Sequence, residues 1–253
     1  MGIAYQEKAI ALIENVITSA ENNPDTLSDE IVEIYTEAGA FHCYAKHYEI
    51  SIEFYQKAIT LVQSEYGTES GLLIKIYCEL ADIYNEMQNV SAQIEYLGYA
   101  VEIAEHTYGE THIQTADIYD KYSMAAINCT NNRILETATE YCKKSFEIYS
   151  SIYGENCEDT ADCLFCRLIL MYQLEQQSEC YHSIKRLQLI YQALYEDDAE
   201  EWGDFYLFSA KIYAHFMDFT AAKKLMPLAI RIYKMHGNDD DAAKAQEILL
   251  TFE

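Results

Sequence analysis

The sequence predicts an all-α protein: a right-handed superhelical solenoid of antiparallel helix pairs, with about 11–12 helices in total. The first observation is a short motif, an aromatic ring followed by glycine or an acidic residue, that recurs every 41 to 45 residues. The second is an amphipathic pattern, with apolar residues three and four positions apart, ahead of each recurrence. The third is a content of only 2 prolines and 9 glycines in 253 residues, which favours long helices with few breaks. The motif occurs at Tyr66-Gly67, Tyr108-Gly109, Tyr153-Gly154, Tyr195-Glu196 and His236-Gly237.

The elements follow from this period in chain order. Residues 3–22 correspond to the second helix of a partial repeat, and residues 239–252 form a capping helix with acidic residues at its positive N-terminal end. Between them lie five helix pairs, each ending at glycine or a polar cluster that can cap a helix. One pair cannot bury its own apolar face, so the pairs are expected to stack into a single solenoid over residues 1–253. The pairs are expected at residues 28–67, 70–109, 112–154, 157–196 and 200–237.

The segment ELADIYNEMQN, followed by AQIEYLGYA, resembles the tetratricopeptide repeat, in which a tyrosine follows a small residue by three positions and an alanine stands in the second helix. The period of about 42 residues exceeds the usual length of about 34, so the chain is most similar to the long repeats of kinesin light chains. The family's glycine at the turn within each pair is replaced by Lys46, Gln88 and Arg133, and the fourth repeat places Leu168 and Leu187 where small residues are expected. The other repeats keep small residues in register: Gly39, Ala81, Ala126 and Ala210 in first helices, and Ala58, Ala100, Ser145 and Ala229 in second helices.

Composition excludes several partner classes. The chain has 42 acidic and 17 basic residues, for a formal net charge of −25, which opposes binding to nucleic acid or to anionic membrane surfaces. The sequence shows neither an apolar stretch long enough to span a bilayer nor a signal peptide. Eight cysteines at mostly apolar helix positions favour a reducing, cytoplasmic location over a disulfide framework.

Catalytic and metal-binding patterns are weak. Cys157, Cys163, Cys166 and Cys180 form the densest thiol cluster, but cysteines flanked by leucine and phenylalanine are better explained as core residues than as zinc ligands. The grouping of His42, Cys43 and His47 is a weaker candidate. Neither a nucleophile elbow nor a phosphate-binding glycine loop is present. The chain is therefore not expected to be an enzyme or to hold a metal or cofactor.

The family resemblance implies that the first helix of each pair lines a concave, partner-binding face. Glu79, Asp82 and Glu86 share one face of such a helix and lie too deep in it to act on the helix dipole, which favours a binding role. Four acids at equivalent positions early in first helices admit both readings, dipole stabilisation or partner binding; these are Glu33, Asp120, Asp162 and Asp204. The full candidate set is Glu33, Glu37, Tyr44, Lys75, Glu79, Asp82, Asn85, Glu86, Asp120, Ser123, Ile127, Asn131, Asp162, Phe165, Ile169, Tyr172, Asp204, Leu207 and Lys211.

These residues predict a binding function. An acidic groove that also contains the apolar residues Phe165, Ile169 and Leu207 suits a protein or peptide with a basic or amphipathic segment. The leading hypothesis is a scaffold or adaptor without catalysis. The alternative is a regulatory or sensing module of a larger protein whose effector domain is absent from this chain. A third possibility is self-assembly into a homo-oligomer through the outer faces.

Overall fold

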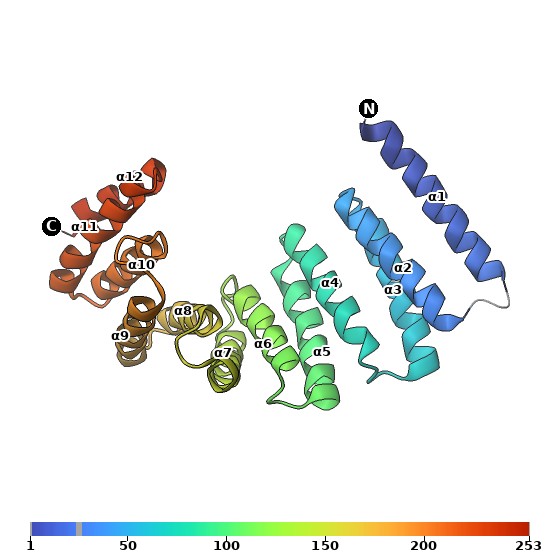
Figure 1. The fold of residues 1–253 in the computed structure, drawn as a ribbon, viewed down its shortest axis with the longest axis horizontal. Coiled ribbons are helices and arrows are strands. Elements are labelled where there is room, and N and C mark those ends of the chain that lie inside the picture. The colour runs from blue at the N-terminus through green and yellow to red at the C-terminus, as the bar shows by residue number, and fades with distance from the viewer. Residues whose placement is uncertain (1, 24–26, 253) are drawn as a thin grey trace. The chain divides into compact units, whose positions relative to one another are not determined.

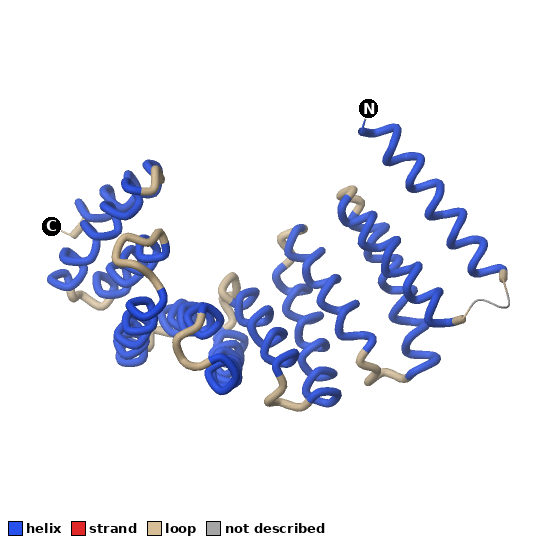
Figure 2. The backbone as a smooth tube through the Cα atoms, in the orientation of Figure 1, coloured by secondary structure: helices blue, strands red, loops and turns tan. Residues whose placement is uncertain are grey.

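The structure is a computed structural model that describes residues 2–23 and 27–252. The described residues form twelve helices joined by short turns and contain no strand (Figures 1 and 2). None of these helices combines the length and apolar character that a membrane crossing requires. The helices are α1 (Gly2–Asn22), α2 (Ser28–Tyr44), α3 (Tyr48–Tyr66), α4 (Leu72–Glu86), α5 (Val90–Tyr108), α6 (Ile113–Ala126), α7 (Asn132–Tyr153), α8 (Glu158–Gln173), α9 (Gln177–Leu194), α10 (Glu201–His215), α11 (Phe219–Met235) and α12 (Asp239–Leu250).

The chain divides into two compact units, Met1–Cys129 and Thr130–Glu253. The first contains α1–α6 and the second α7–α12. The boundary falls inside residues 112–154, which the sequence groups as one helix pair. That grouping, and a single solenoid over the whole chain, therefore stay predictions, and each unit is described by itself.

Polar side chains and glycines set the helix ends. Asn89 and Asp218 accept hydrogen bonds from the backbone N–H groups of Ala92 and Ala221, which satisfies donors that the first helical turn leaves free. Three second helices end at a glycine with φ between 89° and 93°, a conformation that disfavours a side chain. These glycines are Gly67, Gly109 and Gly154.

The turns within pairs correct one expectation. Lys46 and Gln88 adopt positive φ values of 62° and 57°, as do Glu175 and Met217 at 58° and 66°. Arg133, expected at the equivalent turn, instead lies inside α7, because that helix begins at Asn132. The left-handed turn residue is thus non-glycine in four turns.

Small residues allow the two helices of a pair to approach closely. Gly39 of α2 contacts the buried ring of Tyr55 in α3, and Ser51 donates a hydrogen bond of 2.6 Å to the carbonyl of Gly39. Ala81 and Ala100 are fully buried at the corresponding contact of α4 and α5. At Gly39 the small residue thus brings α3 within hydrogen-bonding distance of the α2 backbone.

Successive pairs of the first unit are joined by the same contact twice. The side-chain amide of Gln63 in α3 lies 3.5 Å from the hydroxyl of Tyr77 in α4. The hydroxyl of Tyr119 in α6 donates to the carboxylate of Glu105 in α5. The residues of the second contact lie 42 positions after their counterparts in the first, Glu105 after Gln63 and Tyr119 after Tyr77. The repeat period of the sequence therefore also appears in the contacts of the fold.

The second unit packs around larger side chains. Leu168 and Leu187, the departures from the small-residue pattern, are both fully buried between α8 and α9. The ring of Tyr191 contacts those of Trp202 and Phe205 in α10, with centroids 5.5 and 5.3 Å apart. At the end of this unit α12 buries Ala242 and Ala245 against α10 and α11.

Candidate functional site

The first helices α2 and α4 enclose two adjoining hollows in the first unit. The larger, of about 470 Å³, has an apolar floor that includes Val32 and Ile76 and acidic residues at its edge, Asp29 and Glu33. The smaller, of about 90 Å³, is lined by Glu37 and Glu79 among others. Both hollows share Thr36, Lys75 and Ile76, so they lie next to each other. We call the two hollows, with Asp82 and Glu86 farther along α4, the α2–α4 surface.

The charges of three acids of α4, Glu79, Asp82 and Glu86, act on a cysteine of α2. Burial raises the pKa of the Cys43 thiol in α2, and the charges of Glu79, Glu86 and Asp82 raise it further. Of the three, Glu79 lines the smaller hollow together with Thr36 and Glu37 of α2.

Two of these three acids also make contacts within the protein. Asp82 Oδ2 lies 3.4 Å from Lys121 Nζ of α6, an ion pair between exposed side chains. Glu79 is half-buried next to Tyr55, whose pKa is raised by burial and by the charge of Glu79. Glu86 and the α2 residues Glu33 and Glu37 are exposed.

Sequence reasoning missed one wall of the larger hollow. Tyr66, at the end of α3, donates a hydrogen bond to the carboxylate of Asp29, and both residues line the hollow beside the exposed side chain of Leu72. The recurring Tyr-Gly motif marks Tyr66 as a helix end, but only the fold brings it next to Asp29, 37 residues away. The wall adds an aromatic and an aliphatic surface to the acidic edge.

In the second unit, aromatic residues connect the first helices α8 and α10. The ring of Phe208 lies 5.7 Å from those of Phe165 and Tyr172, and Tyr172 contacts His215 at 4.9 Å. His215 Nε2 is 2.7 Å from Glu175 Oε2 at the turn after α8. Phe165, Tyr172 and Phe208 are partly buried, so part of their apolar surface packs α8 against α10, whereas His215 and Glu175 are exposed. Ile169 and Leu207 are also partly buried.

Two acids predicted to lie on the concave face, Asp204 and Asp162, interact with other residues of the second unit. Asp204 Oδ1 accepts a 2.5 Å hydrogen bond from Tyr233 of α11, which holds the two helices of that pair together. Burial and the charges of Asp159 and Glu158 raise the pKa of the Asp162 carboxyl. Lys211 of α10 is exposed.

Two further candidates do not fit a binding surface. Ser123 is fully buried and donates to the carbonyl of Tyr119, so the expectation that it contacts a partner is wrong. Asn131 lies outside the first helix and caps α7, accepting a 3.0 Å hydrogen bond from the backbone of Arg133. Of the others, Tyr44 is 85% exposed at the end of α2, Asn85 is exposed near the end of α4, and Asp120 and Ile127 are half-buried in or next to α6.

The cysteines have local packing roles. All eight lie in the described part of the chain, and none of them forms a disulfide. Cys163 Sγ is 3.2 Å from Ser145 Oγ, and Cys157 caps α8 through contacts with Thr160. Within residues 2–23 and 27–252, no group of three or more His, Cys, Asp or Glu residues converges to hold a metal ion.

The fold matches known solenoid structures. No protein-family model and no curated protein matches the chain. BtubC (BKLC) from P. vanneervenii is 20% identical, with a TM-score of 0.67 over 92% of each chain. A putative kinesin light chain from P. anserina with nearly identical TPR-like repeats is 12% identical, with a TM-score of 0.57 over 87% of this chain and 93% of that one. The Rap conjugation gene regulator of plasmid pLS20, in complex with the Phr* peptide, is 14% identical, with a TM-score of 0.52 over 92% of this chain and 63% of that one. The all-α, tetratricopeptide-like fold predicted from the repeat is therefore confirmed.

Proposed function

We propose that this chain is a non-catalytic scaffold that binds a protein or peptide, and that the α2–α4 surface of its first unit receives a basic, amphipathic segment of the partner. The observation that carries the proposal is the combination of an apolar floor with an acidic edge. Leu72 and Tyr66 offer exposed apolar area over the buried Val32 and Ile76. The lining also carries Asp29, Glu33 and Glu37, against the cation Lys75. A segment that alternates apolar and basic side chains satisfies both features.

The volume of the larger hollow supports a side-chain anchor. About 470 Å³ falls within the range of sites that hold small ligands, so the hollow has room for one or two apolar side chains. The partner's lysines or arginines would then lie over the exposed carboxylates, where attraction steers association and decreases with salt. The peptide in the Rap regulator complex supports the same class of partner for this fold.

A regulatory role is the second candidate. The Rap neighbour is a conjugation gene regulator in complex with a peptide, which favours a chain whose peptide binding controls another activity. Both candidate functions require peptide binding. In the regulatory role, that binding also controls another activity.

Charge reversal on exposed acids tests the proposal. The triple variant Glu33→Lys, Glu37→Lys, Glu86→Lys leaves out Asp82 and Glu79, because the first pairs with Lys121 and the second is half-buried. Close charge pairs at interfaces are coupled by about 1.5 kcal/mol or more, so three reversals are expected to weaken binding by more than about a hundredfold. The probe is an array of synthetic peptides graded independently by positive charge and by apolar content.

The matched control reverses three exposed acids on second helices, Glu49, Glu65 and Glu102, and so changes the net charge equally. The variant Leu72→Ser removes apolar surface from the hollow without changing charge and is expected to reduce capture of the apolar-rich peptides. The proposal fails if the two triple variants lose peptide binding to the same extent, or if capture by the wild type does not depend on peptide charge.

A further inference from the structure

The second unit contains a basic pocket that the acidic surface does not explain. Its volume is about 200 Å³, and it is lined by residues of α7, α8 and α9. Lys143, Arg167 and Arg186 supply three positive charges, although the chain has only 17 basic residues against 42 acidic ones. Such a concentration of cations is unexpected in so acidic a chain.

Arg167 has a shielded side-chain donor without an acceptor in the part of the chain that the structure describes. Its Nε atom is shielded from solvent and has no hydrogen-bond partner among the described residues. Within the same part of the chain, neither Arg167 nor Lys143 forms an ion pair with a carboxylate. A partly buried guanidinium without a carboxylate partner is costly, and the charge of an anion in the adjoining pocket would offset that cost.

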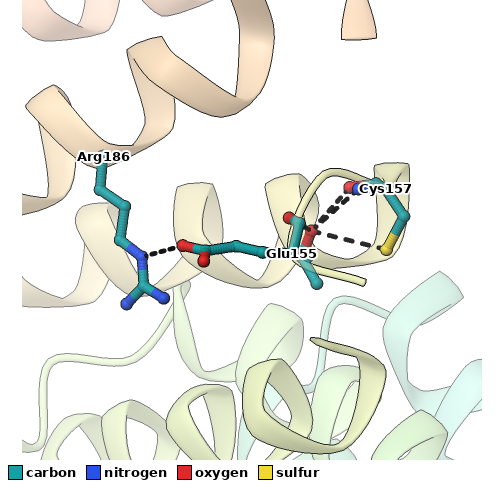
Figure 3. A network of polar contacts seen from close by, with 4 residues as sticks. Glu155, Cys157 and Arg186 are labelled. Atoms are coloured by element: carbon teal, nitrogen blue, oxygen red, sulfur yellow. Dashed lines mark hydrogen bonds and ion pairs between the residues drawn. The ribbon is translucent and has the colours of Figure 1, made fainter. Parts of the chain in front are cut away.

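Arg186 is held in a fixed orientation at the pocket. Its guanidinium lies over the ring of Phe146 at 4.2 Å, and its Nε donates a 2.7 Å hydrogen bond to Glu155 Oε1. In Figure 3 this bond comes from the Nε atom of Arg186, while the two terminal nitrogens of the guanidinium point away from Glu155. Two contacts thus orient the guanidinium and leave its terminal N–H groups available for a second acceptor.

The loop that carries Glu155 is itself anchored. Thr160 Oγ1 donates a 2.6 Å hydrogen bond to the carbonyl of Glu155 and accepts one from the backbone N–H of Cys157, at the start of α8 (Figure 3). This network fixes the residue that positions Arg186 before any ligand arrives. Preorganisation of this kind lowers the entropic cost of binding.

The local charge balance favours an anion. Glu147 lines the pocket and Glu155 pairs with Arg186, so two carboxylates oppose three cations and leave a net positive site. Leu164, Phe146 and the buried Cys142 form the apolar part of the lining, which strengthens electrostatic attraction inside the pocket. The volume corresponds to roughly six water molecules, enough for one tetrahedral oxyanion but too little for a nucleotide.

We propose that Lys143, Arg167 and Arg186 form a binding site for a phosphate group. The planar forks of the two arginines match the oxygens of a phosphate bidentately, and the flexible lysine supplies a third charge at the exposed side. The phosphate belongs either to a free ion or to a phosphorylated side chain. The site is independent of the α2–α4 surface, because it lies in the other unit and attracts the opposite charge.

Calorimetric titration with inorganic phosphate and with O-phosphoserine, at constant ionic strength maintained with sodium chloride, tests the site. Both probes are expected to bind the wild type, and whichever binds more tightly identifies the free or the esterified source. The variants Arg167→Gln and Lys143→Gln are each expected to weaken binding at least about tenfold, the effect of one lost charge-assisted hydrogen bond. The matched control Arg133→Gln changes an exposed arginine of α7 outside the pocket and should bind as the wild type does.

Lys143 is exposed, so its variant reports on binding even if the variant at Arg167 folds poorly. Circular dichroism of each variant verifies the fold before titration. The site is ruled out if Arg133→Gln and Lys143→Gln respond alike, if added chloride produces the same heat as phosphate, or if acetate binds as tightly as phosphate.

Discussion

Gly39 and Tyr55 approach so closely that a Cβ atom at position 39 would lie 2.7 Å from Cε2 of the tyrosine ring. Tyr55 is 1% exposed, so its ring would have to shift within the core to make room for a Cβ atom. The contact explains why the first repeat has glycine at a position where the second, third and fifth repeats have alanine. It also determines how close α2 and α3 can come.

Substitution of Gly39 by alanine is therefore expected to destabilise the first unit. Overpacking costs about 1–3 kcal/mol, and the better helix propensity of alanine offsets about 1 kcal/mol of that. Gly98 is the matched control, because it lies inside α5 and an added Cβ meets nothing within 4 Å. Urea unfolding should show a loss of stability for Gly39→Ala and a gain of about 0.5–1 kcal/mol for Gly98→Ala. Equal stability of the two variants would contradict the steric argument.

Met217 offers a stabilising substitution. It adopts a φ of 66° at the turn after α10 and is 73% exposed, so its backbone is strained and its side chain packs little. Glycine at this position should raise the unfolding free energy by about 1 kcal/mol, because the left-handed conformation disfavours residues with a Cβ. The same change at Met124, which is 64% exposed inside α6, should lower it by about 1 kcal/mol. Opposite shifts in the thermal midpoints of the two variants would verify this explanation.

The tyrosines predict instability at alkaline pH. Burial, followed by the hydrogen bond to Glu21, raises the pKa of Tyr35 to about 12, and burial raises the pKa values of Tyr55, Tyr191 and Tyr233. An unfolded tyrosine ionises near pH 10, so each raised pKa contributes stability that is complete below pH 10 and is lost as pH rises through the folded value. Helical circular dichroism and tyrosinate absorbance should therefore change together above about pH 10. Full tyrosinate absorbance with intact helices would show that these hydroxyls are not shielded.

Cys78 and Cys180 should react slowly with thiol reagents in the native protein. Burial raises the pKa of Cys78 to about 11 and that of Cys180 to about 12, and the thiolate is the reactive form. Each unit by which the pKa rises lowers the thiolate fraction at pH 8 about tenfold. Cys78 should therefore be alkylated about a hundredfold more slowly in the native protein than in urea. Mass spectrometry of the peptide that contains each cysteine measures both rates. Native rates within a few-fold of the denatured rates would mean that local opening exposes these thiols.

The fold was predictable because the repeat can be detected in the sequence itself. The period of about 42 residues, the glycines at helix ends and the few prolines all indicate stacked helix pairs, and each signal depends on local geometry. Burial of small residues such as Ala81 follows from the same register. These signals agree because every repeat has the same packing requirement.

The functional surface was less predictable, because its contacts join residues that are distant in the chain. Helical spacing places Asp82 and Asp204 on first helices, but it does not show that the first pairs with Lys121 or that the second bonds to Tyr233. Ser123 has the spacing of an exposed residue and is nevertheless buried, and the hydrogen bond of its hydroxyl to its own helix offsets the cost of that burial. No local pattern in the sequence brings Arg186 to a pocket shared with α7.

The contact from Gln63 to Tyr77 and its counterpart from Tyr119 to Glu105 make the first unit extendable by whole segments. Each contact joins the end of one pair to the start of the next, with partners 14 positions apart. A second copy of residues 70–111 inserted after position 111 would present its own Tyr77 to the existing Glu105 and its own Glu105 to Tyr119. Because a carboxylate accepts from a tyrosine hydroxyl as readily at the new junction as at the old one, the array could grow by duplication without redesigning either neighbour.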